Sequence, residues 1–408
     1  MMKVLTLSTV FPNPVQPVHG LFVFERTRHA AKRAEIRVVA PVPWFRRSRS
    51  IPSTTTQRDL QVEHPTFFYV PGLLKFLDGL FLFLSVLPRV RRLQRESDFD
   101  VIDAHFAFPE GFAAILLGMW FRKPVMVTLR GSEHEFVTHP PRRKAIAWAL
   151  KRATRVVAVS HQLAQLAEEL GVPRERIAVV ENGVDIDTFR PGDRAEAKRT
   201  IGFDDTRRLL ISVGHLVPLK GYHRMIRAVA DLRSAYPDLA LALVGGSAST
   251  SGSYPKELKQ LASELGLSSS VLFPGSLPPD QVCAWLNAAD VFVLCSDREG
   301  CPNVVWESMA CGVPVASARV GEVEYMVPSR AGELFDDPAD RGALRAAISR
   351  ALDRRWDRGD IRAHAEAHTW THVAQRVERQ WHLCLNGKGS SIDTLTPVDA
   401  NVNDARRS

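Results

Sequence analysis

The sequence predicts an α/β protein in which two largely parallel β-sheets divide the chain between them. Its length of 408 residues suits two domains better than one compact core. Short apolar runs alternate with helical segments, which is the pattern of βαβ units. A polar stretch containing Pro and Gly interrupts this alternation at 185–205. We therefore expect one α/β domain before the interruption and a second one after it.

Six apolar runs predict the strands of the first sheet, and helical segments lie between several of them. The segment at 161–171 ends at Gly171, a residue type typical of helix C-termini. In open parallel sheets, ligands bind at the carboxyl ends of the strands. The six runs are 4–10, 36–42, 100–106, 125–131, 155–160 and 177–183.

The second sheet is predicted from apolar runs that resume after the polar stretch, at 209–214, 239–246, 270–275, 290–296 and 314–318. A further helical segment at 369–385 follows both sheets, and the residues after it lack hydrophobic periodicity. The predicted organisation is an N-terminal domain at 1–190, a C-terminal domain at 191–368, a C-terminal helix at 369–385 and a disordered tail at 386–408.

The composition is ordinary for a globular protein, with 45% hydrophobic and 24% charged residues. A net charge of +8 favours acidic partners, such as nucleic acid, an anionic membrane or phosphorylated small molecules. Five cysteines without a CxxC pair predict neither a disulfide framework nor a zinc site, which favours a reducing cytoplasm. The N-terminus predicts a strand rather than a signal peptide. The uncharged run at 79–88 is shorter than the roughly 20 residues that cross a bilayer, so no transmembrane span is expected.

The stretch DREGCPNVVWESMACGVPVAS, at 297–317, contains the most informative pattern. It follows a predicted buried strand, and residues 303–311 within it predict a helix. If Asn303 caps this helix, the first backbone N–H groups of the helix are unpaired and form a phosphate site. The N–H groups concerned are those of Val304, Val305 and Trp306.

Two carboxylates flank this predicted helix start. Glu299, in the preceding loop, can reach sugar hydroxyls, and Glu307, one turn inside the helix, can accept two hydrogen bonds from a ribose diol. Together with the phosphate site they predict binding of a nucleotide-sugar. The alternative is that both glutamates only complement the helix dipole, which is worth about 0.3–1 kcal/mol each.

A second strand–turn–helix segment, SVGHLVPLKGYHRMIRA at 212–228, places Lys220 in the turn. Its ammonium group can meet a diphosphate as a point charge. The alternative is a solvated loop lysine. The turn opens the second sheet at the same strand ends as Glu299, which favours the binding role.

Taken together, VGHLVPLKG at 213–221 and EGCPNVVWESMACGVPVAS at 299–317 resemble the retaining glycosyltransferases of family 4, which have the GT-B fold. That fold has two Rossmann-like domains, a cleft between them and a C-terminal helix that crosses back to the N-terminal domain. The similarity extends from residue 3 to about 385. Further matching segments are 100–135, 156–191, 241–247 and 321–326.

The resemblance implies roles for individual residues. Glu299 would contact the donor sugar, Glu307 the ribose, and Lys220 the diphosphate, where it would stabilise charge on the departing phosphate. Gly20, before the helix at 21–31, would lie across the cleft, its missing side chain allowing close approach. The backbone lining the sugar and diphosphate would be that of Gly300, Cys301, Pro302, Asn303, Val304 and Val305.

The sequence departs from the family pattern at two positions. His215 stands where the family usually has Arg, so the grip on the diphosphate falls more heavily on Lys220. Arg130 stands where His is common, and an Arg cannot act as a base. We expect Arg130 to steady negative charge, and we hypothesise that it supplies the charge His215 lacks. His105 is a candidate for acceptor-side chemistry, with a structural role as the alternative.

No metal or other cofactor is expected. The Asp-x-Asp runs at 98–100 and 185–187 resemble a metal motif of another glycosyltransferase fold, but loop residues beside strands explain them better. In enzymes like those this chain resembles, helix N-termini and basic side chains neutralise the diphosphate. The resemblance thus implies transfer from a UDP- or GDP-sugar with retained anomeric configuration.

The acceptor is predicted to be a glycan or a lipid-linked molecule of bacterial cell-surface polysaccharide synthesis, including teichuronic-acid-type pathways. This rests on resemblance. The segment at 73–95 combines a Leu/Phe-rich body with a basic end, which suits an anionic membrane surface. An ordinary core helix with a solvated end is the alternative. We expect a cytoplasmic protein, peripheral at the membrane if the first interpretation holds.

The sequence also bears on three other functions. Nucleic-acid binding fits the net charge, but no stacking-aromatic pattern, zinc spacing or recognisable motif accompanies it. A dinucleotide-dependent oxidoreductase lacks the G-x-G-x-x-G that would follow its first strand. A catalytically inactive glycosyltransferase-like scaffold stays open because of His215 and Arg130.

Overall fold

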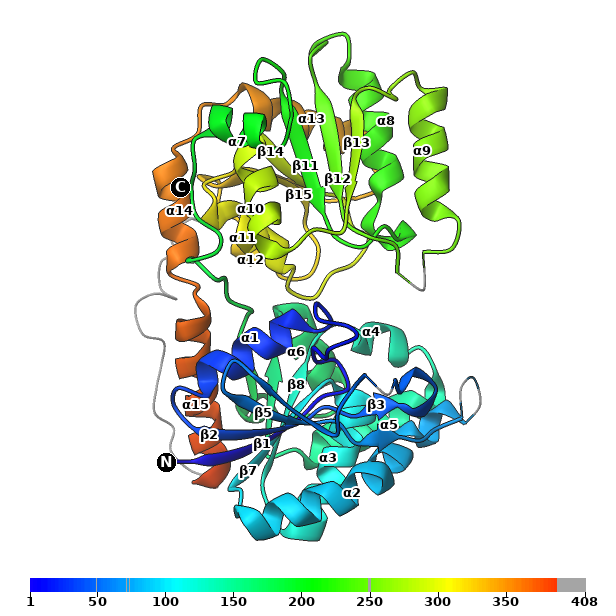
Figure 1. The fold of residues 1–408 in the computed structure, drawn as a ribbon, viewed down its shortest axis with the longest axis vertical. Helices are drawn as coiled ribbons and strands as arrows, with labels where there is room; N and C mark the ends of the chain where they lie inside the picture. Colours follow the sequence, from blue (N-terminus) through cyan, green and yellow to red (C-terminus); the bar gives the residue numbers. More distant parts are fainter. Residues whose placement is uncertain (49, 71, 73, 249–250, 387–408) are drawn as a thin grey trace.

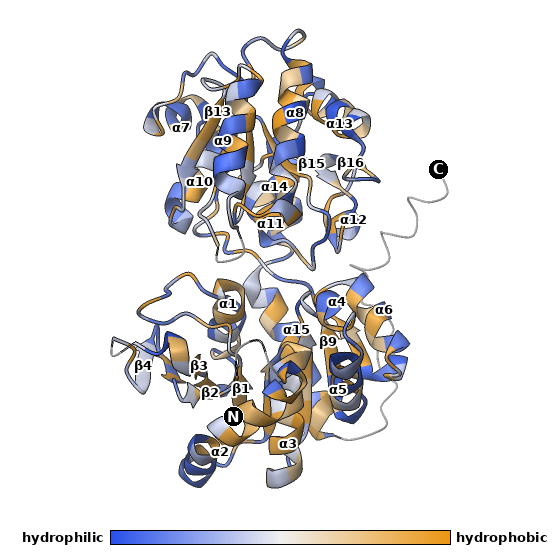
Figure 2. Ribbon diagram, turned by 90° about the vertical axis from the view of Figure 1, so that its right-hand side faces the viewer, coloured by the Kyte–Doolittle hydropathy of each residue, from blue (hydrophilic) through white to orange (hydrophobic). Residues whose placement is uncertain are grey.

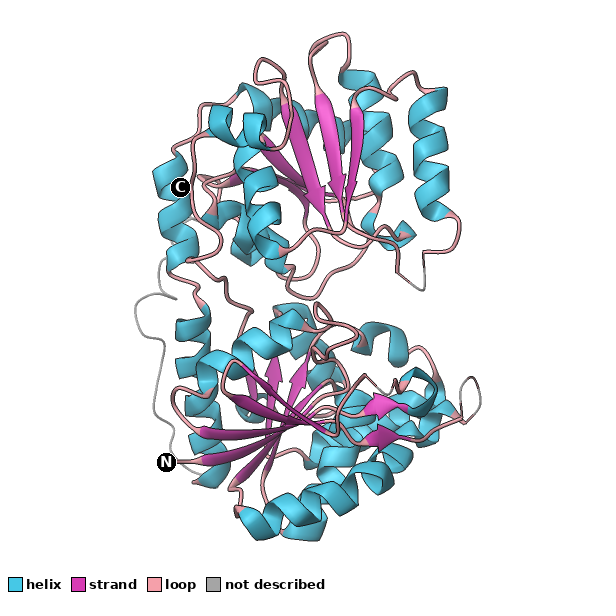
Figure 3. Ribbon diagram, in the orientation of Figure 1, coloured by secondary structure: helices cyan, strands magenta, loops and turns pink. Residues whose placement is uncertain are grey.

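The computed structural model describes residues 1–48, 50–70, 72, 74–248 and 251–386. The chain forms two lobes, each built around a β-sheet with helices on both of its faces (Figure 1 and Figure 3). The predicted α/β class and the division into two sheets are confirmed. Of the predicted disordered tail, only Asn386 is among the described residues.

The N-terminal lobe contains an eight-stranded sheet in the order β10-β9-β8-β7-β1-β2-β5-β4. All neighbours are parallel except β4 and β5. The six predicted strands are all present, but the β4–β5 hairpin was not predicted. Its turn residues Arg58 and Asp59 have φ of 43° and 72°, a conformation that Asn-Gly pairs usually signal. The strands are β1 (Lys3–Leu7), β2 (Glu35–Val39), β4 (Thr54–Gln57), β5 (Leu60–Glu63), β7 (Val101–His105), β8 (Val125–Leu129), β9 (Arg155–Ala158) and β10 (Ile177–Val179).

Helices and short segments cover this sheet. Ser160 begins α6 because its hydroxyl accepts a hydrogen bond from the Leu163 N–H, at 3.2 Å. The helices are α1 (Leu21–Ala30), α2 (Asp78–Glu96), α3 (Phe112–Phe121), α4 (Glu133–Phe136), α5 (Pro140–Arg152) and α6 (His161–Glu169). The short segments are η1 (Trp44–Arg46), η2 (Lys75–Leu77), η3 (Ala107–Gly111), η4 (Arg174–Arg176) and the strand pair β3 (Val42–Pro43) and β6 (Thr66–Phe67).

The C-terminal lobe contains a fully parallel six-stranded sheet in the order β13-β12-β11-β14-β15-β16. Its first strand is central, so the connections run outward in both directions, and the strand order reverses between β11 and β14, the point at which such sheets bind ligands. The short β16 was not predicted. The strands are β11 (Leu209–Val213), β12 (Ala240–Val244), β13 (Val271–Gly275), β14 (Val291–Leu294), β15 (Val315–Ala318) and β16 (Gly332–Phe335).

The helices of this lobe include α7, which lies within the polar stretch at 185–205. Asp193 begins it by accepting a hydrogen bond from the Glu196 N–H, at 2.8 Å. The helical segments are α7 (Arg194–Thr200), η5 (Pro218–Lys220), α8 (Tyr222–Leu232), α9 (Tyr254–Glu264), α10 (Pro279–Ala288), α11 (Asn303–Ala310), α12 (Val323–Met326), α13 (Arg341–Asp353) and α14 (Arg358–Glu366).

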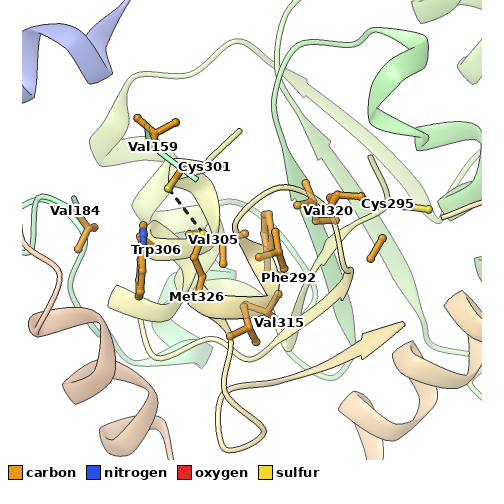
Figure 4. Close-up of a cluster of buried hydrophobic side chains, with 14 of the residues drawn as sticks. Val159, Val184, Phe292, Cys295, Cys301, Val305, Trp306, Val315, Val320 and Met326 are labelled. Carbon is orange, nitrogen blue, oxygen red and sulfur yellow. Dashed lines mark hydrogen bonds between the residues drawn. The ribbon is translucent and has the colours of Figure 1, made fainter. Parts of the chain in front are cut away.

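The core follows the strands and the inward faces of the helices, where most hydrophobic residues gather (Figure 2). Around β14 and α11 the packing is continuous, with Phe292, Trp306 and Val315 fully buried (Figure 4). Trp306 also stacks on His368, with ring centroids 4.2 Å apart. Because α11 is anchored in this way, the loop that precedes it is held at the strand ends.

The last helix, α15 (Trp370–Leu385), returns to the N-terminal lobe, as predicted (Figure 1). Trp381 donates a hydrogen bond to Asp103 Oδ2 of β7, at 3.2 Å, and Arg155 Nη2 donates to Gln380, at 2.8 Å. The helix therefore links the two lobes a second time.

The segment predicted at 73–95 forms η2 and α2, with Leu73 outside the described residues. One face of α2 is buried, and Arg89 pairs with Glu63 at 3.0 Å, as the core-helix interpretation predicts. Its other face exposes Leu84, at 55%. Over the described part of the chain, no helix is long and apolar enough to span a membrane.

Candidate functional site

Lys220 and Glu299 meet beyond the carboxyl ends of β11 and β14 in the C-terminal sheet. Lys220 ends η5 after β11, and Glu299 lies in the loop after β14; Lys220 Nζ is 2.5 Å from Glu299 Oε1. The Ser296 hydroxyl donates to the same oxygen, at 2.6 Å. The side chains of Lys220 and Glu299 are 20% and 12% exposed to solvent. The cation and the carboxylate predicted from separate motifs are thus in direct contact and reachable from solvent.

The start of α11 differs from the prediction in two respects. Pro302 occupies the N-cap position, and Asn303 is the first helical residue, so Asn303 does not cap the helix. Its Oδ1 instead accepts a hydrogen bond from Asn182, at 2.8 Å. The N–H of Val305, expected to be free, donates to the Pro302 carbonyl at 3.1 Å. Pro302 has φ of −75° and ψ of 107°, outside the helical region, so the helix begins at Asn303, one residue earlier than a cap at Asn303 would place it.

Glu307 faces a cavity of about 670 Å³ that residues of both lobes line. Leu21 and Phe22 of α1 contribute from one side, and Val213, Leu277 and Glu307 from the other. Burial raises the pKa of Glu307 to about 7. Lys220 and Glu299 are not among the residues lining this cavity. Glu307 and the ion pair both follow strands at the carboxyl edge of the same sheet.

Gly20 lies at the start of α1, with φ of 73°. A Cβ there would come within 2.4 Å of the Val10 carbonyl oxygen. The backbone itself thus requires glycine, for a reason other than the approach of a ligand that the sequence had suggested.

Arg130 and His105 lie at the ends of β8 and β7 and are buried together, at 9% and 1% exposure. Arg130 Nη2 lies 2.8 Å from His105 Nδ1, and because guanidinium only donates, that nitrogen is the acceptor. Burial and the neighbouring Arg130 and Arg26 hold the pKa of His105 well below its usual value, so the ring is neutral. Its Nε2 is 3.9 Å from Asp103. His105 is thus part of a buried polar network.

Arg130 also stacks on Phe22, with its guanidinium carbon 5.3 Å from the ring centroid. Its Nη1 donates to Asn182 Oδ1 at 2.7 Å, and Asn182 in turn donates to the Cys301 carbonyl at 3.2 Å. His215, by contrast, is exposed. Asn182 was not singled out from the sequence, although a polar residue near the carboxyl end of the predicted strand at 177–183 was a usable signal.

The two lobes also meet through a buried carboxylate that sequence reasoning missed. Glu322, fully buried, accepts hydrogen bonds from the backbone N–H and Nδ1 of His161, both at 2.7 Å. This bond raises the pKa of His161. Nearby, a Cβ on Gly300 would lie 2.7 Å from the Arg130 carbonyl oxygen. The backbones of the two lobes are therefore close at this point.

A second carboxylate fixes the loops of the N-terminal lobe. Glu133, 1% exposed, accepts hydrogen bonds from the backbone N–H groups of Ala107, Arg130 and Gly131, at 2.8–3.1 Å. Nothing in its sequence context distinguished it from other loop glutamates.

The two Asp-x-Asp runs lie in loops, as predicted. Asp98 pairs with Lys123 at 2.8 Å, Asp100 accepts from the Lys3 N–H at 2.8 Å, and Asp185 accepts from Thr188. Within residues 1–386, leaving out those not described, no three His, Cys, Asp or Glu side chains are grouped so that they could hold a metal ion.

Two doubly wound lobes joined by a returning C-terminal helix define the GT-B architecture. Sucrose-phosphate synthase from Thermosynechococcus elongatus superposes with a TM-score of 0.81 at 19% identity, over 95% of this chain and 100% of that one. Anabaena HepE in complex with UDP-glucose superposes with a TM-score of 0.71 at 20% identity, over 94% and 100%. At these identities the similarity establishes the fold.

The chain belongs to the glycosyltransferases. Residues 20–188 match the family profile "Glycosyltransferase Family 4", and residues 193–368 match "Glycosyl transferases group 1". A putative teichuronic acid biosynthesis glycosyltransferase from Bacillus subtilis is 29% identical over 341 residues, covering 80% of this chain and 83% of that protein. A D-inositol 3-phosphate glycosyltransferase from Acidothermus cellulolyticus is 38% identical over 182 residues. That alignment covers 43% of this chain and 41% of the relative, so the matched segment spans less than half of its length.

Proposed function

We propose that this glycosyltransferase moves a sugar from a UDP- or GDP-sugar to an acceptor hydroxyl with retention of the anomeric configuration. The observation that carries the proposal is the Lys220–Glu299 pair, 2.5 Å apart at the carboxyl ends of β11 and β14. A nucleotide-sugar offers a diphosphate to the ammonium group and hydroxyls to the carboxylate. When the donor binds, the Lys220 ammonium group would contact the diphosphate in place of Glu299, and the Glu299 carboxylate would contact the sugar hydroxyls in place of Lys220.

The reaction forms a bond between the acceptor oxygen and the anomeric carbon and breaks the bond from that carbon to the phosphate oxygen. The electron pair of the broken bond leaves with the diphosphate, where Lys220 stabilises the negative charge. Arg130 cannot take the acceptor proton, and the Nδ1 lone pair of His105 is already engaged with Arg130. The proposal therefore assigns that proton to the departing phosphate oxygen.

Glu307 would bind the ribose, because it faces the cavity between the lobes and carries two acceptor oxygens. The base would then contact the apolar part of the same cavity, near Leu277 and Val282. HepE, which shares the fold, was crystallised in complex with UDP-glucose, and this makes uridine donors the first to test. The cationic side chain at the diphosphate makes a bound metal unnecessary in this proposal.

The proposed acceptor is a glycan or lipid-linked molecule of cell-surface polysaccharide synthesis, handled at the cytoplasmic face of the membrane. The teichuronic acid relative supports the polysaccharide assignment through its name. The exposed apolar residues of α2 support contact with a lipid surface, as the membrane-surface interpretation of segment 73–95 requires.

A panel of UDP- and GDP-sugars tests the proposal through thermal stabilisation and slow hydrolysis of the donor. We expect one donor to raise the melting temperature and to be hydrolysed at an unchanged rate in EDTA. Stabilisation without hydrolysis or transfer to any acceptor would instead support the inactive scaffold. If no nucleotide-sugar stabilises the protein, the donor assignment is wrong.

A further inference from the structure

The N-terminal lobe contains a second cavity, of about 620 Å³, that the donor proposal does not use. Part of its wall is the loop between β1 and α1, including Thr9, Asn13 and His19. His19 lies next to Val18 in the chain, and Val18 lines the cavity of about 670 Å³ between the lobes. One end of this cavity is therefore a single residue away along the chain from the cavity that Glu307 faces.

Three cations from separate elements line the cavity: Arg46 of η1, Lys75 of η2 and Arg142 of α5. Among the described residues, none of the three forms an ion pair with a carboxylate. The one carboxylate in the lining is Asp78, on which Arg142 and Lys75 both act. Its Oδ1 is buried without a hydrogen-bond partner in the described chain, and burial raises its pKa to about 6.

This excess of positive charge favours an anion. Unpaired like charges that face one cavity repel one another, and a doubly charged group such as phosphate offsets that repulsion while accepting charge-assisted hydrogen bonds. Arg in particular binds phosphate through two parallel N–H groups. Because Arg46 and Lys75 are exposed and Arg142 is partly buried, water screens part of this repulsion, and a phosphate in the cavity adds attraction to each cation.

Exposed apolar residues lie next to two of the lining cations in the chain, and we call these residues the rim of the cavity. Each of the two short helical turns that carry a rim cation also exposes apolar neighbours, with Trp44 at 47% and Phe45 at 45% beside Arg46, and Leu74 at 52% and Phe76 at 43% beside Lys75. Phe45 packs on Tyr69, which lines the cavity, with ring centroids 5.6 Å apart. The apolar surface thus continues from outside the lobe to the mouth of the cavity.

We propose that this cavity binds a phosphate or diphosphate group of an amphiphilic acceptor, with Arg46, Lys75 and Arg142 on the phosphate and the hydrocarbon chain on the aromatic rim. The inference rests on the proposed glycosyl transfer and specifies its acceptor. The phosphate is held away from the donor, while the hydroxyl end of the same molecule points towards the cleft through the His19 end of the cavity.

Calorimetric titration of the full chain tests the proposal with decyl phosphate, inorganic phosphate and decyl maltoside, each below its micelle concentration. We expect decyl phosphate to bind more tightly than either of the other two. The variants Arg46→Gln, Lys75→Gln and Arg142→Gln should each weaken it about tenfold, the cost of one charge-assisted hydrogen bond. Arg143→Gln, next to Arg142 on the same helix but exposed and outside the cavity, is the matched control and should leave binding unchanged.

A double variant of the rim, Trp44→Ser with Phe76→Ser, should weaken decyl phosphate and leave inorganic phosphate unchanged. Equal binding of decyl phosphate by wild type and all three glutamine variants would overturn the phosphate site. Arg142→Lys keeps the positive charge and should keep more of the binding than Arg142→Gln, which distinguishes loss of the charge from misfolding. Inorganic phosphate bound as tightly as decyl phosphate would overturn the amphiphilic acceptor. Thermal stabilisation by a nucleotide-sugar is measured on the same variants. If no nucleotide-sugar stabilises the wild-type protein, the glycosyl-transfer proposal is refuted, independently of the phosphate site.

Discussion

The two lobes have a central first strand in common, with β1 between β2 and β7 and β11 between β12 and β14, yet they place charged residues differently. In the C-terminal lobe, Lys220 and Glu299 pair at the rim and retain 20% and 12% exposure. In the N-terminal lobe, Arg26 and Asp103 pair at 3.4 Å with 3% and 2% exposure. The first pair can exchange its partner for a ligand, whereas the second is enclosed and holds α1, β7 and α15 together.

The largest effect should come from breaking the enclosed pair. Asp103→Ala leaves Arg26 buried without its carboxylate and removes the acceptor of Trp381, so the free energy of unfolding should fall by about 3–5 kcal/mol. Chemical denaturation measures it. Asp98→Ala, at an exposed loop ion pair, is the control and should change little. Equal stability of Asp103→Ala and wild type would show that the network does not hold the lobe.

Breaking the Lys220–Glu299 pair should affect catalysis rather than folding. Lys220→Ala removes the cation that faces the departing diphosphate, and Glu299→Ala removes the acceptor for sugar hydroxyls, so donor turnover should fall about 10²–10³-fold. The melting temperature should stay near that of wild type because both side chains are solvent-reachable.

Lys256→Ala, an exposed lysine on α9, is the matched control and should keep full turnover. Near-normal rates in Lys220→Ala and Glu299→Ala would refute the assignment of the donor site.

A smaller effect is expected from pH at Glu307. The ribose diol needs a carboxylate acceptor, and burial raises the pKa of Glu307 to about 7, so the side chain becomes competent only as pH rises through that value. Donor affinity should increase about tenfold between about pH 6 and about pH 8, following the ionised fraction. Glu307→Gln should abolish this dependence in a calorimetric titration. An unchanged slope in the variant would place the titrating group elsewhere.

The smallest effect concerns the contact between the lobes. The hydrogen bond to Glu322 raises the pKa of His161 in the folded protein. The stabilisation that this bond gives the folded protein is therefore complete below the pKa of His161 in the unfolded chain, and it declines as pH rises through the higher pKa of the folded protein. His161→Ala should therefore lower the melting temperature more at acidic than at alkaline pH. Because the ring is half exposed, the loss in the free energy of unfolding should be larger at acidic than at alkaline pH by about 0.2–1 kcal/mol. The same loss at both ends of the pH range would mean that protonation of His161 does not matter.

Local patterns predicted most of the fold and part of the site. Apolar runs located the main strands, because a buried parallel strand needs a continuous hydrophobic stretch. The β4–β5 hairpin was missed because its turn lacks Gly or Asn. Helix α7 was missed because it lies within a polar stretch, where its start depends on the Asp193 cap. Asn303 was expected to cap α11, but Pro302 takes that position.

The sequence by itself determined the βαβ order, the position of Glu299, Glu307 and Lys220 at strand ends, and the family. The order and the strand-end positions follow from periodicity and spacing, which are local properties of the chain, and the family follows from the resemblance of the segments at 213–221 and 299–317. Only the tertiary structure decided which charges meet. Glu322 and His161 lie 161 positions apart, and Lys220 and Glu299 lie 79 apart, so packing of whole elements sets their distances. The reason is physical: burial and pairing, which decide whether a charge serves a ligand or the scaffold, belong to the folded surface and not to any segment of it.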